Sequence, residues 1–93
     1  MIVEWLHKAI STRDAQLDFI AENNPIAAIE YGDSLAQQVN QLSVYPELGR
    51  AGRKQGTREL VISGTSFVVI YRVKLKEKRV EILRVLHSSQ KWP

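Results

Sequence analysis

The sequence contains no cysteine and only two histidines, and these shortages exclude several kinds of site. Without cysteine the chain has neither disulfide bonds nor thiolate ligands for a metal. His7 and His87 lack the spacing of a metal-binding pair, so we expect no metal and no other cofactor. The chain also lacks an apolar run of transmembrane length and a secretory leader. These absences predict a cytoplasmic protein without a membrane partner.

The charge is divided unevenly between the two halves of the chain. Residues 1–48 carry two basic and seven acidic side chains, a net charge of −5, whereas residues 49–93 carry eleven basic and three acidic ones, a net charge of +8. A basic half favours an acidic partner, which is either a nucleic acid or an acidic protein segment. At 93 residues the chain is expected to form one domain over residues 1–93.

Three strands are predicted in the second half, at residues 59–62, 65–73 and 80–86. The middle strand is apolar on both faces, with Phe67 and Val69 on one side and Val68 and Ile70 on the other. A strand of this kind needs cover on both sides, and one pair of helices covers only one. We therefore expect an open apolar patch that makes the free chain poorly soluble and that a partner covers.

The first half is predicted to contain a short strand at residues 2–5 and two helices. Asn24 is expected to cap the second helix and Pro25 to occupy its first turn. Gly32, inside that helix, is expected to mark a close approach to the first helix. The apolar stripe expected to face the sheet comprises Ile26, Ile29, Leu35, Ala36, Val39 and Leu42. The fold class is α+β, with an antiparallel helix hairpin packed on a small antiparallel sheet.

A cationic connection, residues 46–58, joins the helices to the sheet and contains three glycines and four basic residues. Exposed backbone N–H groups beside arginine can bind a phosphate or a carboxylate. A plain linker with solvated arginines explains the same segment equally well, because no glycine-rich phosphate-binding pattern is present.

Four segments together resemble the ParE/RelE superfamily of bacterial toxins, and the resemblance covers nearly the whole chain. They are Pro-Glu-Leu-Gly-Arg-Ala-Gly-Arg at 46–53, Gly-Thr-Arg-Glu-Leu-Val at 56–61, Phe-Val-Val-Ile-Tyr-Arg-Val at 67–73 and Val-Glu-Ile-Leu-Arg-Val-Leu-His at 80–87. The resemblance implies two helices on an antiparallel sheet and a toxin of a type II toxin–antitoxin pair. It also implies a cognate antitoxin whose disordered tail wraps and neutralises the toxin.

The superfamily has two activities, and the sequence departs from one of them. Members similar to RelE are ribosome-dependent mRNA endoribonucleases that place an arginine early in the central strand and basic or tyrosine residues in the tail. This chain has Val68 at the strand position, and residues 88–93 contain neither arginine nor tyrosine. Members similar to ParE bind and inhibit DNA gyrase. The resemblance therefore favours gyrase as the target, with the ribosome and mRNA as the alternative partners.

The candidate site residues follow from these two hypotheses. A gyrase-binding toxin has no catalytic residues, whereas the ribonuclease alternative would use Arg58, Arg84 and His87. Arg58 and Arg84 interrupt apolar strands, so we expect them beside an exposed groove of the sheet, in contact with the antitoxin. Trp92 is expected either to anchor a partner or to fold back onto the helix hairpin. The set expected to bind target or antitoxin is Arg50, Arg53, Lys54, Arg58, Arg84, His87, Lys91 and Trp92.

Overall fold

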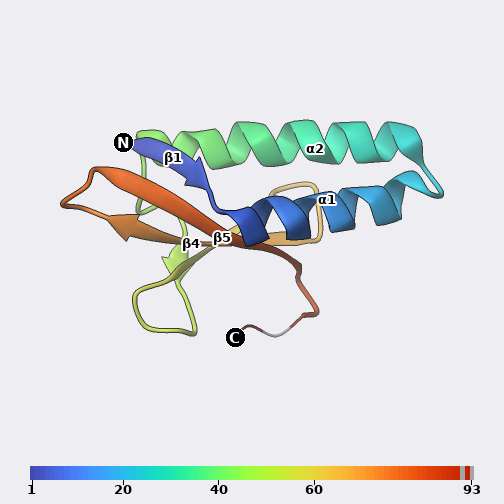
Figure 1. Cartoon of the computed structure of the whole chain (residues 1–93). Helices are drawn as coiled ribbons and strands as arrows, with labels where there is room; N and C mark the ends of the chain where they lie inside the picture. The colour runs from blue at the N-terminus through green and yellow to red at the C-terminus, as the bar shows by residue number, and fades with distance from the viewer. Residues whose placement is uncertain (91, 93) are drawn as a thin grey trace.

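The computed structural model describes residues 1–90 and Trp92, and it places a helix hairpin on one face of a five-stranded sheet (Figure 1). The strand order across the sheet is β1-β5-β4-β3-β2. The elements, in chain order, are β1 (Ile2–Trp5), α1 (His7–Ala21), α2 (Pro25–Asn40), the 3₁₀ helix η1 (Gln41–Ser43), β2 (Arg50–Ala51), β3 (Arg58–Val61), β4 (Phe67–Lys74) and β5 (Arg79–His87).

The sheet is mixed, which confirms the α+β class and corrects the expectation of an antiparallel sheet. Strands β2, β3, β4 and β5 pair antiparallel, whereas β1 pairs parallel with β5, from Ile2 opposite Arg79 to Trp5 opposite Ile82. The predicted hairpin explains the antiparallel pairing of β4 and β5, because a short connection reverses the chain. β1 and β5 lie at opposite ends of the chain and are not joined by a short turn. No turn therefore forces them to pair antiparallel.

The helix hairpin begins and turns where the sequence predicts. The side chain of Asn24 accepts a hydrogen bond from the Ala27 N–H at 3.1 Å, and Pro25 occupies the first turn of α2. Both predictions are confirmed. Gly32 does face α1, but a Cβ atom built there would lie 3.5 Å from Leu17 Cδ1, an ordinary contact. The approach is therefore close without requiring glycine.

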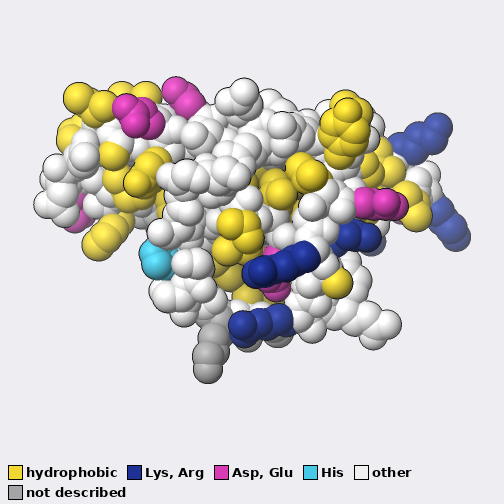
Figure 2. Space-filling model, turned by 180° about the vertical axis from the view of Figure 1, so that it is seen from behind, with side chains coloured by type: hydrophobic (Ala, Val, Ile, Leu, Met, Phe, Trp, Pro, Cys, Tyr) yellow, Lys and Arg dark blue, Asp and Glu magenta, His cyan; other side chains and the backbone are white. Residues whose placement is uncertain are grey.

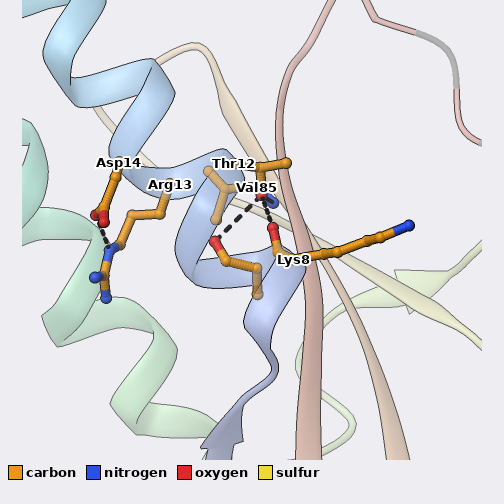
Figure 3. Close-up of polar contacts among 6 residues, drawn as sticks. Lys8, Thr12, Arg13, Asp14 and Val85 are labelled. Carbon is orange, nitrogen blue, oxygen red and sulfur yellow. Dashed lines mark hydrogen bonds and ion pairs between the residues drawn. The ribbon is translucent and has the colours of Figure 1, made fainter.

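Helix α1 is held against the edge of β5 by a threonine (Figure 3). The Thr12 hydroxyl accepts a hydrogen bond from the Val85 N–H at 2.9 Å and donates to the Lys8 carbonyl at 2.8 Å. The pairing of β1 with β5 ends at Ile82, so the Val85 N–H lies beyond the reach of β1. Thr12 supplies the acceptor that this N–H needs, which positions α1 over the end of the sheet.

The main core lies between the helices and the sheet, but it does not use all of the predicted apolar stripe. Ile26 is 70% exposed and Ile29 is 66% exposed, so their assignment to the core is wrong. The cause is length, since the hairpin extends well beyond the sheet (Figure 1) and leaves no strand beneath its far end. The buried residues of this core are Ala9, Leu35, Val39, Leu42, Leu60, Ile62, Phe67, Val69, Tyr71, Val80, Ile82 and Val85.

The opposite face of the sheet, the outer face, has a small core of its own. Val68, Ile70 and Leu83 are 9%, 2% and 8% exposed, and Leu6, Leu86 and Trp92 pack against them. A register shift between Ile70 and Tyr71 leaves Leu83 without a paired residue on β4. The expectation that this face stays open is therefore wrong, because the chain covers it with its own side chains.

A network of ion pairs occupies the outer face beside this small core. Glu81 lies between Arg72 Nε at 2.7 Å and Arg79 Nη2 at 2.9 Å, and Arg79 also lies 3.1 Å from Glu4. The Arg72 side chain, by its hydrogen bond, holds the pKa of Glu81 below its ordinary value, and Arg79 contributes in the same direction. The network fastens β1, β4 and β5 together at one end of the sheet.

Candidate functional site

The start of the cationic connection is held in place by a buried tyrosine. The Tyr71 hydroxyl donates to the Pro46 carbonyl and accepts from the Gly49 N–H, both at 2.8 Å. Burial raises the pKa of Tyr71 above its usual value of 10.0. A Cβ atom at Gly49 would lie 2.8 Å from the Glu59 carbonyl oxygen and from the tyrosine, so this position requires glycine. The start of the connection is thus fixed to the sheet by specific hydrogen bonds and is not a loose linker.

Arg58 reinforces the same anchor. It lies in register with Tyr71, and its Nη1 donates to the Gly49 carbonyl at 2.8 Å and reaches the Glu47 carbonyl at 3.5 Å. A half-buried guanidinium that binds carbonyl oxygens satisfies its charge locally without a carboxylate. The geometry uses one nitrogen of the guanidinium to position the connection, and the expected contact of Arg58 with a partner stays a prediction.

The other predicted cations surround a notch on the outer face, between the cationic connection and the C-terminal tail. Arg50 Nη2 lies 3.1 Å from Glu59, and the Arg53 N–H donates to the same carboxylate at 3.3 Å. Lys54 lies over the Trp92 ring, 5.6 Å from its centroid. We call this feature the cationic notch; its lining includes Arg50, Arg53, Glu59, Val68, Ile70, Leu86, His87, Ser88, Gln90 and Trp92.

Trp92 does not fold back onto the helix hairpin, which was one of the two positions expected from the sequence, and its role as an anchor for a partner stays a prediction. It is half-buried against the outer-face core of Val68, Ile70 and Leu83, and so does not reach the helix hairpin. The position of Trp92 is explained by the hydrophobic effect, because the outer-face core is the apolar surface that the helices leave uncovered. Lys91, the remaining predicted residue of the tail, lies outside the described residues.

Arg84 is a further predicted cation that the structure leaves available on the outer face. It pairs in register with Ile70, next to the register shift, and is half-buried. Its Nη1 donates to the Leu83 carbonyl at 2.7 Å, and no carboxylate among the described residues forms an ion pair with it. Arg84 is therefore not sealed in the helix–sheet core and retains donors for a partner.

His87 lies at the exposed end of β5. It pairs in register with Phe67, whose side chain belongs to the helix-facing core, whereas Arg84 pairs with Ile70 of the outer-face core. The His87 Nδ1 accepts the Ser89 N–H at 3.2 Å and lies 2.8 Å from the Ser89 hydroxyl. A neutral ring accepting at Nδ1 carries its proton on Nε2. The register agrees with the prediction that the two residues occupy opposite faces of the strand, but His87, at the strand end, also lines the cationic notch.

A second surface lies beneath the free end of the helix hairpin and was missed at the level of sequence. We call it the overhang groove. Tyr31 and Phe67 form its floor, edge to face with ring centroids 6.0 Å apart, and Phe19 on its rim is 69% exposed. The groove encloses about 510 Å³ and is lined by Gln16, Phe19, Ile20, Tyr31, Ser66, Phe67, His87, Ser89 and Gln90.

The two surfaces differ in chemistry. Figure 2 shows hydrophobic and a few acidic side chains at the free end of the hairpin, whereas the Lys and Arg side chains of that view lie over the centre and the other end, among further hydrophobic ones. The only sequence signal for the groove is Phe19, an aromatic residue outside the apolar stripe of its helix. Within residues 1–90 and Trp92, no group of three side chains suits a metal ion, and no helix is long and apolar enough to cross a membrane.

Comparison with known proteins gives consistent matches over nearly the whole chain. A family model described as the ParE toxin of the type II toxin–antitoxin system parDE matches residues 3–92. A curated relative, "Putative toxin Y4kP" of Sinorhizobium fredii, is 34% identical over 91 residues, which cover 98% of this chain and 92% of the relative.

Solved structures agree with these sequence matches. The chromosomal ParDE toxin–antitoxin system from P. aeruginosa matches with a TM-score of 0.83 and 28% identity, over 94% of this chain and 95% of that one. A RelBE2 toxin–antitoxin complex from Mycobacterium tuberculosis matches with a TM-score of 0.61 and 18% identity, over 96% and 92%, and so shares the fold. The chain belongs to the ParE family of toxins from type II toxin–antitoxin systems.

Proposed function

We propose that the chain acts in the cytoplasm by binding and inhibiting DNA gyrase, and that a cognate antitoxin neutralises it. The observation that carries the proposal is that no hydrogen bond joins any two of the three side chains of the ribonuclease alternative, all of which the structure describes. Arg58 binds carbonyl groups of the cationic connection, Arg84 lies on the outer face, and His87 lies in register with the helix-facing Phe67.

Cleavage of RNA needs cations and proton-transfer groups preorganised around one phosphate. Loss of one preorganised charge typically costs about 100- to 1000-fold in rate. At the strand position where the ribonucleases carry arginine, this chain has Val68, which is 9% exposed in the outer-face core. A protein target requires no such constellation, because a cationic rim and an apolar centre suffice for an interface.

The antitoxin is assigned to the overhang groove, and gyrase to the cationic notch with Arg84. The groove offers aromatic side chains and few charges, which suits an apolar segment that folds as it binds. Arg50, Arg53 and Glu59 line the notch, and Lys54 lies over Trp92 beside it, so the cations outnumber the carboxylate, which suits an acidic surface. The match to a solved ParDE system supports an antitoxin as the partner of this chain.

Two assays on the purified chain test the target. In a gyrase supercoiling assay we expect inhibition, and the double change Arg50→Ala with Arg53→Ala should weaken it roughly two- to tenfold, since exposed charges contribute modestly. The matched control is Lys76→Ala in the exposed turn between β4 and β5, which should leave inhibition unchanged. Cleavage of mRNA in programmed ribosomes, abolished by His87→Ala, would instead establish the ribonuclease activity.

A third assay tests the antitoxin assignment separately. Phe19→Asp places a carboxylate on the rim of the overhang groove and should weaken antitoxin binding at least tenfold while leaving gyrase inhibition intact. Titration calorimetry of the coexpressed antitoxin against both chains measures the effect. Equal affinity for the two chains would remove the antitoxin from this groove.

A further inference from the structure

Two separate arms of the chain meet over the outer face, and one contact joins them. The first arm is the turn of the cationic connection that carries Lys54, and the second is the C-terminal tail that carries Trp92. Lys54 Nζ lies 5.6 Å from the centroid of the Trp92 ring. Beneath them lies the outer-face core of Val68, Ile70 and Leu83.

The first arm is a stable turn that presents Lys54. The Gly52 N–H donates to the Thr57 carbonyl at 2.8 Å, and the Thr57 N–H donates back to the Lys54 carbonyl at 3.1 Å. Gly56 completes the turn in a left-handed conformation, with φ of +83°. The turn can therefore hold Lys54 in place while its ammonium group remains exposed.

The second arm is anchored at its base rather than at its end. The Ser88 N–H donates to the Ser66 carbonyl at 2.7 Å, and the Gln90 side-chain oxygen accepts from the His87 N–H at 2.7 Å. The Gln16 side chain of α1 donates to the same oxygen at 3.0 Å. These bonds fix the base of the tail, and Trp92 packs against the outer-face core.

We propose that Lys54 and Trp92 form a reversible latch that closes the outer face of the free chain and opens to admit a partner. An exposed cation–π contact is weak, so its loss raises the ratio of open to closed molecules only about two- to fivefold. Opening uncovers an apolar patch beside Arg50, Arg53 and Arg84, which suits an apolar side chain carried on an acidic segment.

The latch deepens the proposed function because it would control access to the surface assigned to gyrase. Only this control of gyrase binding rests on the proposed function. Its existence can be tested on the free chain without any partner. Failure of the latch and failure of the gyrase assignment are therefore distinguishable.

The test measures solvent exchange of the Trp92 indole N–H by NMR in the full chain, with the signal assigned from Trp92→Phe. Lys54→Ala should accelerate this exchange two- to fivefold, whereas Lys54→Arg, which keeps a cation over the ring, should not. Lys76→Ala is the control for loss of a remote exposed lysine. Acrylamide quenching in a Trp5→Phe background gives a second readout of the same opening.

Two results would overturn the latch. One is an unchanged exchange rate and unchanged quenching in Lys54→Ala. The other is a Trp92 indole that already exchanges and is quenched like free tryptophan in the unmodified chain. The amide signals of β4 and β5, recorded in the same spectra, show whether each variant retains the fold.

Discussion

At the scale of single residues, two polar side chains have structural roles that strand patterns alone do not reveal. Tyr71 belongs to an apolar strand, yet its hydroxyl holds Pro46 and Gly49 far away in the sequence. Arg58 is predicted from the sequence to contact a partner, yet its Nη1 also binds a backbone carbonyl within the chain. In both cases the side chain forms its hydrogen bonds with backbone groups. Because every residue has a backbone, the sequence does not indicate which backbone group is bound.

Tyr71→Phe should lower the free energy of unfolding by about 1–3 kcal/mol, because it leaves the buried Gly49 N–H and the Pro46 carbonyl without their partner. Urea denaturation measures the change. The control is Tyr45→Phe, at a tyrosine that is 63% exposed, where we expect a change within about 0.5 kcal/mol. Equal losses in the two variants would show that the Tyr71 hydroxyl does not hold the connection.

Glu81 should make stability depend on pH in the acid range. Its pKa in the folded chain is lowered, first by the hydrogen bond from Arg72. Its contribution is therefore complete above the unfolded carboxyl value of about 4.3 and is lost as pH falls through the lower folded value. Urea midpoints between pH 7 and pH 2 should show a stability gap between the chain and Glu81→Gln that closes only in acid.

Glu77→Gln provides the comparison for this pH dependence, since Glu77 lies in the exposed turn between β4 and β5. Its midpoints should follow those of the unmodified chain at every pH. A gap for Glu81→Gln that persists unchanged to pH 2 would mean that the ion pairs with Arg72 and Arg79 contribute nothing to stability.

At the scale of elements, the sequence predicts what depends on local patterning. The alternation in residues 67–73 assigns the two faces of β4 correctly, and Asn24 with Pro25 locates the start of α2. Local sequence patterns do not predict features that depend on elements distant in the sequence. The exposure of Ile26 and Ile29 depends on how far the sheet extends beneath the hairpin, and the position of Trp92 depends on an uncovered core that only the assembled sheet creates.

The two glycines of this chain that touch other elements should respond oppositely to the same substitution. Gly32→Ala should stabilise the chain by about 0.5–1 kcal/mol, because alanine favours the helix and the new methyl group meets Leu17 at an ordinary distance. Gly49→Ala should destabilise it by about 1–3 kcal/mol, because the methyl group overlaps the Glu59 carbonyl and Tyr71. Thermal melts of both variants test the pair, and a destabilised Gly32→Ala would reveal tighter helix packing than described.

At the scale of the whole molecule, charge and shape distinguish two surfaces, the free end of the helix hairpin and the basic face of the sheet. Residues 1–48 carry a net charge of −5 and form the helix hairpin, whereas residues 49–93 carry +8 and form most of the sheet. The hairpin overhangs the sheet, so its exposed apolar side chains lie at one end of an elongated body with extents of 42 × 24 × 23 Å. One end thus suits an apolar partner, and the basic face suits an acidic one.

The overhang should make the free chain self-associate. Phe19, Ile26 and Ile29 are each at least 66% exposed and all belong to the helix hairpin, and exposed apolar side chains of this size favour association in water. The change Phe19→Ser with Ile29→Gln should keep the chain monomeric at concentrations where the unmodified chain aggregates, with stability changed by less than about 1 kcal/mol because neither residue belongs to the core. Light scattering against concentration measures the association, and Val68→Ser, which opens the outer-face core instead, should not improve it. An unmodified chain that stays monomeric at millimolar concentration would show that the overhang needs no partner to cover it.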